Sequence, residues 1–149
     1  NMNKKGFTLA EIIAVIIVIA TVSLISFPTF KNYTQNLEIK SSTKQFISHL
    51  KIAQQYTVTE QIKYAIIITP LNNSYSLVKI GDPDVTIETY ALDETVYFAS
   101  NTGIQDNEVS FNFGGGVDYA GQVFITHLHA EITTLVDIKP SGYVNWQEQ

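Results

Sequence analysis

The sequence contains no cysteine, so no disulfide can staple the fold, and thiolate chemistry and cysteine-type zinc sites are excluded. Arginine is also absent, because all nine basic residues are lysine. Residues 64–149 hold two lysines against eleven acidic residues, a net charge of −9, whereas residues 31–63 carry a net charge of +3. An acidic segment without arginine binds phosphate poorly, so direct contact with nucleic acid is not predicted.

Charge is nearly missing from residues 7–30, where Glu11 is the only ionisable side chain. A helix of this length, rising ~1.5 Å per residue, can cross a bilayer core of ~30 Å. The basic flank formed by Lys4 and Lys5 favours retention of that end at the cytoplasmic face. An acid inside such a run is costly in lipid, which makes Glu11 a candidate functional residue.

No side chain in the apolar run can neutralise Glu11, but a free α-amine at Phe7 could do so. Such an amine would arise from a cut between Gly6 and Phe7, and it would lie about one helical turn from Glu11. The partner of Glu11 would then be the amine of its own chain or that of a neighbouring chain.

Residues 5–11, Lys-Gly-Phe-Thr-Leu-Ala-Glu, resemble the prepilin cleavage and methylation motif of type IV pilins and type II secretion pseudopilins. The resemblance implies a leader at residues 1–6 (from Met2 if that residue is the start) and cleavage after Gly6 by a prepilin peptidase. It further implies N-methylation of Phe7.

The same resemblance implies that Glu11 guides docking into a helical filament. Pro28 adds to it, because family members often carry a proline at this distance from the cut. The implied partners are other pilin or pseudopilin subunits, prepilin peptidase and the cytoplasmic membrane. The implied location is a single-pass protein in the cytoplasmic membrane with its head outside, and then an extracytoplasmic filament.

Residues 7–30 are predicted to form the transmembrane and assembly helix. An amphipathic helix is predicted to follow at residues 31–60. A proline inside a helix removes one backbone donor and bends or loosens it, so Pro28 either bends a continuing helix or ends it. Residues 29–36 contain no glycine, which favours continuation. One face is apolar at three- and four-residue steps and is expected to pack in the core. Its members are Ile39, Thr43, Phe46, Leu50, Ala53 and Thr57.

The pattern changes to strands after residue 63. Strands are predicted at 64–69, 75–80, 85–90, 96–98, 109–113, 122–126, 132–139 and 143–146, with a polar loop at 100–108. Gly114, Gly115 and Gly116 indicate a wide turn, because the Lys-Ser/Thr that follows a phosphate-binding loop is absent.

The predicted fold class is therefore α+β, a long N-terminal helix packed on an antiparallel β-sheet head at residues 61–149. The helix is membrane-spanning in its first half and amphipathic in its second. From Phe111 to Val144 the sequence contains four features in order: a phenylalanine-containing strand, a glycine turn, a Gly-x-hydrophobic strand and a closing strand. This order resembles that of the H-type (FimT-like) minor pseudopilins.

The sequence offers weak candidates for metal ligands, but no metal site is predicted. His127, His129 and Glu131 alternate, so on a strand they would share one face, and two histidines with a carboxylate can bind zinc. No supporting shell is evident, and a solvated hairpin tip explains them equally well. Two further groups offer oxygen ligands without the spacing of a calcium loop and indicate turns instead. These groups are Asp82 with Asp84, and Asn101, Asp106, Asn107 and Glu108.

No enzyme and no cofactor are predicted, since the sequence has no Gly-x-Ser-x-Gly elbow, although a dispersed catalytic triad is not excluded. The alternative to a filament subunit is a membrane-anchored or secreted surface domain, an adhesin or an enzyme, with an ordinary signal sequence. That alternative does not explain Glu11. Type II secretion, DNA uptake in competence and surface pili are the three systems open to a filament subunit.

Overall fold

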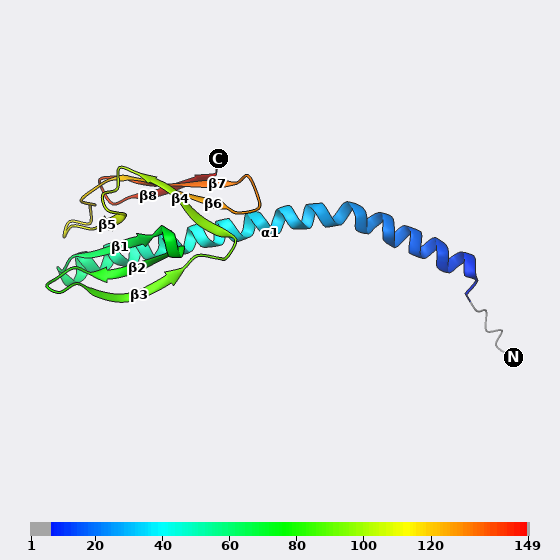
Figure 1. Cartoon of the computed structure of the whole chain (residues 1–149), viewed down its shortest axis with the longest axis horizontal. Helices are drawn as coiled ribbons and strands as arrows, with labels where there is room; N and C mark the ends of the chain where they lie inside the picture. The colour runs from blue at the N-terminus through cyan, green and yellow to red at the C-terminus, as the bar shows by residue number, and fades with distance from the viewer. Residues whose placement is uncertain (1–6, 149) are drawn as a thin grey trace. The chain divides into compact units, whose positions relative to one another are not determined.

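The computed structural model describes residues 7–148, except for the side chain of Pro28. In this range one long helix, α1 (Leu9–Glu60), is followed by a short 3-10 helix, η1 (Pro70–Asn72), and a series of strands (Figure 1). The strands are β1 (Tyr64–Thr69), β2 (Ser74–Lys79), β3 (Val85–Ala91), β4 (Val96–Thr102), β5 (Glu108–Ser110), β6 (Gly121–His127), β7 (Thr133–Ile138) and β8 (Val144–Glu148).

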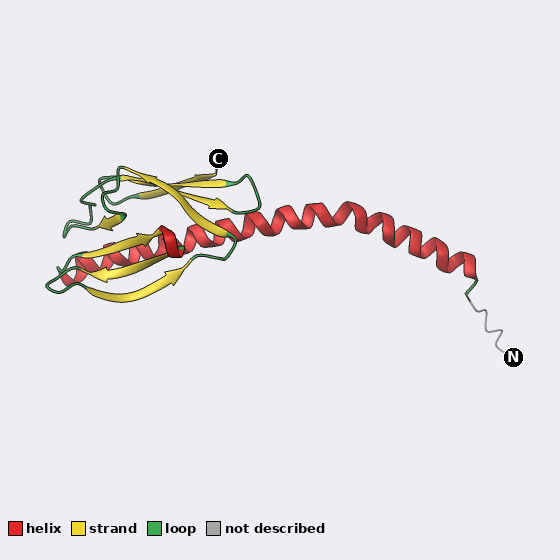
Figure 2. Cartoon of the chain, viewed as in Figure 1, coloured by secondary structure: helices red, strands yellow, loops and turns green. Residues whose placement is uncertain are grey.

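The strands form two four-stranded sheets rather than the one sheet that was predicted. One has the order β3-β2-β1-β5 and the other β4-β6-β7-β8, and every pair is antiparallel. Figure 2 shows both sheets beside the C-terminal half of α1. The α+β class with a long N-terminal helix on antiparallel strands is confirmed. Alternating patterns identify strands but do not specify which of them share a sheet.

The chain divides into two compact units, and the division lies between Thr34 and Gln35. The second unit, Gln35–Gln149, is called the folded unit below. The described buried apolar residues lie between Ile39 and Val144, so the folded unit contains this core in full.

The predicted apolar stripe of α1 is confirmed as its core face: all six members are fully buried. Phe46 is central, because its ring meets the rings of Tyr75 and Phe98 edge-on at centroid distances of 5.0 and 5.4 Å. Aromatic pairs prefer such edge-to-face contacts. One residue of α1 therefore joins β2 of the first sheet to β4 of the second.

Two predicted strand ends differ from the structure by three residues or more. β4 continues to Thr102, into the stretch expected to be a loop, because a register shift between Phe98 and Ser100 keeps its polar residues paired with β6. β5 ends at Ser110; beyond it, Phe111 forms an isolated bridge with Val117, and its N–H donates to Tyr64 O at 3.1 Å. A polar stretch indicates exposure to solvent, but it does not distinguish a loop from the exposed end of a strand.

Replacement of two buried threonines of α1 by valine is expected to affect stability differently. Thr57 Oγ1 donates to Ala53 O at 2.9 Å and accepts from Tyr64 N at 3.0 Å, whereas Thr43 Oγ1 has no partner among the described residues. Thr57→Val is expected to cost about 1–3 kcal/mol, because Tyr64 N–H is left buried and unpaired. Thr43→Val is expected to be neutral or stabilising. Chemical denaturation of the folded unit measures both, and equal effects would contradict this reasoning.

Candidate functional site

The start of α1 is fixed by a capping box formed by Thr8 and Glu11. Glu11 Oε2 accepts hydrogen bonds from Thr8 N at 2.8 Å and from Thr8 Oγ1 at 2.9 Å, and Glu11 N donates to Thr8 Oγ1 at 3.3 Å. Reciprocal bonds of this kind satisfy helix-terminal donors that otherwise lack partners. Glu11 therefore has a local structural role that was not expected, although the Thr-x-x-Glu spacing signals it.

The predicted cleavage site borders this capping box. Gly6 lies outside the described residues, and Phe7 directly precedes Thr8 with a side chain that is 86% exposed. A cut before Phe7 would create an amine one residue from the Thr8 N–H, which already binds the Glu11 carboxylate. The local geometry is thus compatible with an amine partner for Glu11, whose assembly role stays a prediction.

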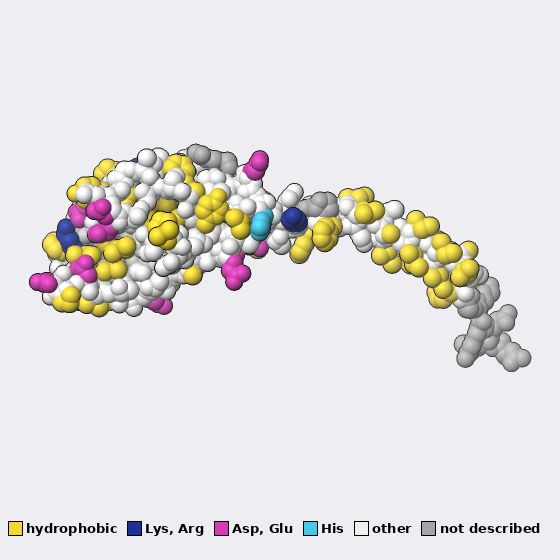
Figure 3. Space-filling view, in the orientation of Figure 1, with side chains coloured by type: hydrophobic (Ala, Val, Ile, Leu, Met, Phe, Trp, Pro, Cys, Tyr) yellow, Lys and Arg dark blue, Asp and Glu magenta, His cyan; other side chains and the backbone are white. Residues whose placement is uncertain are grey.

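The N-terminal half of α1 presents apolar side chains all around its axis. Every described side chain from residue 7 to residue 33 is exposed, and Figure 3 shows hydrophobic groups along this part of the helix. A helix that is hydrophobic all round requires a membrane or neighbouring helices to cover it. By length and composition α1 is able to cross a membrane, although signal sequences meet the same criterion.

The hydroxyl groups of this segment bond to its own backbone. Thr21 Oγ1 donates to Val18 O at 2.8 Å, Ser23 Oγ to Ile19 O at 2.8 Å and Ser26 Oγ to Val22 O at 3.0 Å. Such bonds remove the need for water at these side chains. The segment is therefore suited to an apolar environment despite its serines and threonines.

Helix α1 continues through Pro28, so the favoured prediction of one continuous helix is confirmed and termination at the proline is wrong. The missing N–H of Pro28 leaves one carbonyl a turn earlier without its usual helical donor. Its role in assembly remains a prediction.

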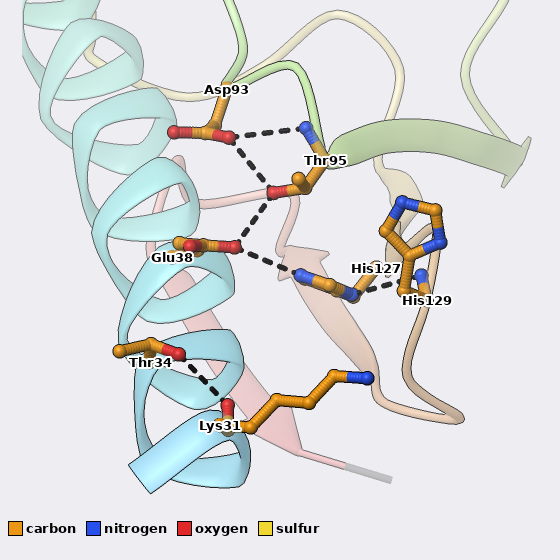
Figure 4. A network of polar contacts seen from close by, with 7 residues as sticks. All are labelled: Lys31, Thr34, Glu38, Asp93, Thr95, His127 and His129. Atoms are coloured by element: carbon orange, nitrogen blue, oxygen red, sulfur yellow. Dashed lines mark hydrogen bonds and ion pairs between the residues drawn. The ribbon is translucent and has the colours of Figure 1, made fainter. Parts of the chain in front are cut away.

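The structure does not align His127, His129 and Glu131 on one strand face. Strand β6 ends at His127, so His129 and Glu131 lie in the connection to β7 and are exposed. His127 is buried, with both ring nitrogens engaged: Nε2 lies 3.0 Å from Glu38 Oε2, and Nδ1 accepts from His129 N at 3.1 Å (Figure 4). Among residues 7–148 no group of three or more His, Asp or Glu side chains is arranged to hold a metal ion.

Glu38 is the centre of a polar network within the folded unit (Figure 4). Besides contacting His127, its Oε2 accepts from Thr95 Oγ1 at 2.8 Å, and Asp93 Oδ1 lies 2.8 Å from the same hydroxyl. Hydrogen bonds from His127 and then from Thr95 hold the pKa of Glu38 below its ordinary value. Because Nδ1 of His127 accepts a hydrogen bond, the ring N–H is on Nε2, and this N–H donates a hydrogen bond to Glu38. The network ties α1 to β6 and to the turn before β4.

Glu38→Ala is expected to destabilise the folded unit by about 1–3 kcal/mol, because the buried Nε2–H of His127 loses its acceptor. The contribution of Glu38 is present above the ordinary pKa of glutamate and is lost as the pH falls through its lowered folded pKa. The difference from wild type should therefore shrink in acid. Denaturation at neutral and acidic pH measures it, with the exposed Glu131→Ala as a control that should change little.

Of the other oxygen-rich groups, Asp82, Asp84, Asp106 and Asn107 lie in bends, turns or loops, whereas Asn101 lies in β4 and Glu108 in β5. Asp84 Oδ1 accepts from Gly81 N at 2.9 Å, and Asn107 Oδ1 accepts from Asn101 Nδ2 at 2.6 Å. Side chains that hold nearby donors in this way are typical of turn chemistry.

Comparisons with known proteins agree with this description. A model of the prokaryotic N-terminal methylation motif matches residues 1–27, and no curated protein matches the chain in sequence. The fold is similar to that of the minor pseudopilin EpsH from the type 2 secretion system of Vibrio cholerae, with a TM-score of 0.62 and 11% identity over 74% of this chain and 96% of that chain. It is also similar to the type IV minor pilin FimU of Pseudomonas aeruginosa, with a TM-score of 0.63 and 11% identity over 77% of this chain and 92% of that chain. The motif match is thus confined to the start of the chain, and the structural likeness shows that the chain shares the fold of these minor subunits.

Proposed function

We propose that this chain is a minor pilin or pseudopilin, a structural subunit of a type IV pilus-like or type II secretion-like filament. The observation that carries the proposal is an exposed, largely apolar helical segment at residues 9–30 whose single acid, Glu11, lies within the matched methylation motif. The fold of the head, similar to EpsH and FimU, supports the same function. The role is structural rather than catalytic.

The chain enters the cytoplasmic membrane through residues 7–30, with Lys4 and Lys5 on the cytoplasmic side. Prepilin peptidase cuts after Gly6, and the new amine of Phe7 is methylated. The apolar helix then leaves the lipid and packs among the helices of neighbouring subunits, which keeps its surface away from water. The order of strands favours the H-type, FimT-like minor subunits within the superfamily.

The Glu11 carboxylate and the Phe7 amine set the register of the subunit in this assembly. A buried carboxylate without an opposite charge is strongly disfavoured, so a subunit that docks out of register is rejected. The charge pair thus supplies specificity to an apolar interface that would otherwise tolerate sliding.

Mass spectrometry of the mature N-terminus tests the proposal. The expected first residue is N-methylphenylalanine from Phe7; an intact leader, or a cut elsewhere, would instead favour a membrane-anchored or secreted domain that acts alone.

Gly6→Ala tests the cleavage step separately. The variant is expected to accumulate as the uncut form, since the peptidase motif places glycine directly before the cut. Comparison of the two forms on a gel measures processing, and a normal amount of mature protein would contradict the assignment of Gly6.

A further inference from the structure

A groove runs between α1 and β8 on the folded unit. At one end Lys40 Nζ and Glu148 Oε1 form an ion pair at 2.9 Å, and at the other Gln54 Nε2 donates to Gly142 O at 3.4 Å. Helix and strand therefore run antiparallel between these contacts. From Lys40 to Gln54 the helix rises ~21 Å, and from Gly142 to Glu148 a strand spans ~20 Å, so the two sides match in length.

The lining of the groove is mainly polar, with a small apolar floor. Its central hollow has a volume of about 370 Å³ and is lined by Ile47, Val144 and Trp146 as well as by polar groups. Ile47 and Val144 are 7% and 8% exposed, so they form a nearly closed floor. Lys51 and Val144 also line a hollow of about 670 Å³ beside the turn at Gly114 and Gly115, into which the groove continues.

One wall of the groove is the free edge of a sheet, because β8 is the last strand of its sheet and pairs with β7. Lys139 N donates to Tyr143 O at 2.9 Å, so by the alternation of antiparallel pairing Asn145 also bonds toward β7. The backbone groups of Val144 and Trp146 then point away from β7. Trp146 N donates to the side chain of Asn145 at 2.9 Å, a local substitute for a missing strand.

The other wall carries positive charge that no acidic side chain among residues 7–148 pairs with. Lys44 and Lys51 lie seven residues apart, two helical turns, and therefore on the same face of α1. Lys40, Lys63 and Lys139 form ion pairs, whereas Lys44 and Lys51 form none with the described residues. In a chain of net charge −5, two free cations beside an open strand edge select an acidic partner.

We propose that this groove binds an extended acidic strand of a neighbouring subunit, which adds to the sheet beside β8. Main-chain hydrogen bonds to Val144 and Trp146 supply affinity, as in other cases of strand addition. Alternate side chains of the incoming strand contact Ile47 and Trp146, and its carboxylates meet Lys44 and Lys51. The assignment of the strand to a neighbouring subunit rests on the proposed function. The groove and its binding chemistry do not depend on that function.

The test uses the full chain in detergent micelles and a capped nine-residue peptide in which valine alternates with glutamate and threonine. In a titration followed by amide NMR, shifts are expected at residues 44–51 and on β8. The double variant Lys44→Glu, Lys51→Glu is expected to weaken binding roughly tenfold or more, because two attractions become repulsions. Lys79→Glu, a charge reversal outside the groove, serves as the control.

A second peptide separates strand addition from charge attraction alone. Methylation of the peptide nitrogens that face β8 removes main-chain donors and keeps the charges, so it is expected to abolish binding. Equal binding of the methylated peptide, or no shifts with millimolar peptide, would overturn the proposal. Self-association of the chain through Lys44 and Lys51 in the absence of peptide would show that a second copy of the chain occupies the groove. That result would also overturn the proposal. None of these results depends on N-terminal processing, so failure here leaves the proposed function standing.

Discussion

Gly142→Ala is expected to destabilise the folded unit by about 2–5 kcal/mol, combining an unfavourable backbone conformation with overpacking. Gly142 has a φ of +80°, and a Cβ at this position would lie 2.0 Å from Gly115 O and 2.4 Å from Gln54 Nε2. The backbone oxygen cannot move aside, because it accepts a hydrogen bond from Gln54 Nε2 at 2.6 Å. The substitution therefore separates two turns and detaches both from α1.

Gly114→Ala is the matched control for this prediction. Gly114 belongs to the same pair of turns, but a Cβ there would meet only the side chain of Asn112 at 3.4 Å. An ordinary contact of this kind is expected to cost little. Denaturation of both variants of the folded unit measures the difference, and equal stabilities would show that the turns yield more easily than their geometry indicates.

The sequence was sufficient to predict elements whose pattern is local. The core face of α1, from Ile39 to Thr57, follows from side chains spaced at helical steps, and continuation past Pro28 follows from the absence of glycine. Strands β1 and β2 follow from two β-rich runs on either side of Pro70 and Asn73, and the structure pairs them as a hairpin.

Features that join distant residues could not be predicted in this way. Glu38 and His127 are 89 residues apart, and Gln54 and Gly142 are 88 apart, so no local pattern links them. The triple glycine was expected only to allow a wide turn, whereas Gly115 also accepts the bond from Gln54. The histidines were considered as ligands because their pattern is local, but the burial of His127 depends on the fold.

Glu11→Ala and Glu11→Gln are both expected to reduce incorporation into filaments on the order of a hundredfold or more. In the proposed filament Glu11 pairs with the Phe7 amine, and loss of the carboxylate would leave that amine buried without an opposite charge. Membrane insertion should remain intact, because an apolar helix without its acid enters lipid more easily. Sheared filaments from cells that express each variant measure incorporation, and membrane fractions measure insertion.

The comparison of these two variants distinguishes charge from helix capping. Glutamine can occupy the third helical position of a capping box, so Glu11→Gln keeps the bonds to Thr8 but removes the charge, whereas alanine removes both. Thr8→Ala completes the set by weakening the cap while keeping the carboxylate. If charge pairing with the Phe7 amine governs assembly, the glutamine variant is lost from filaments and the Thr8 variant is retained. The reverse pattern would mean that Glu11 acts only by starting α1, and the register role would be wrong.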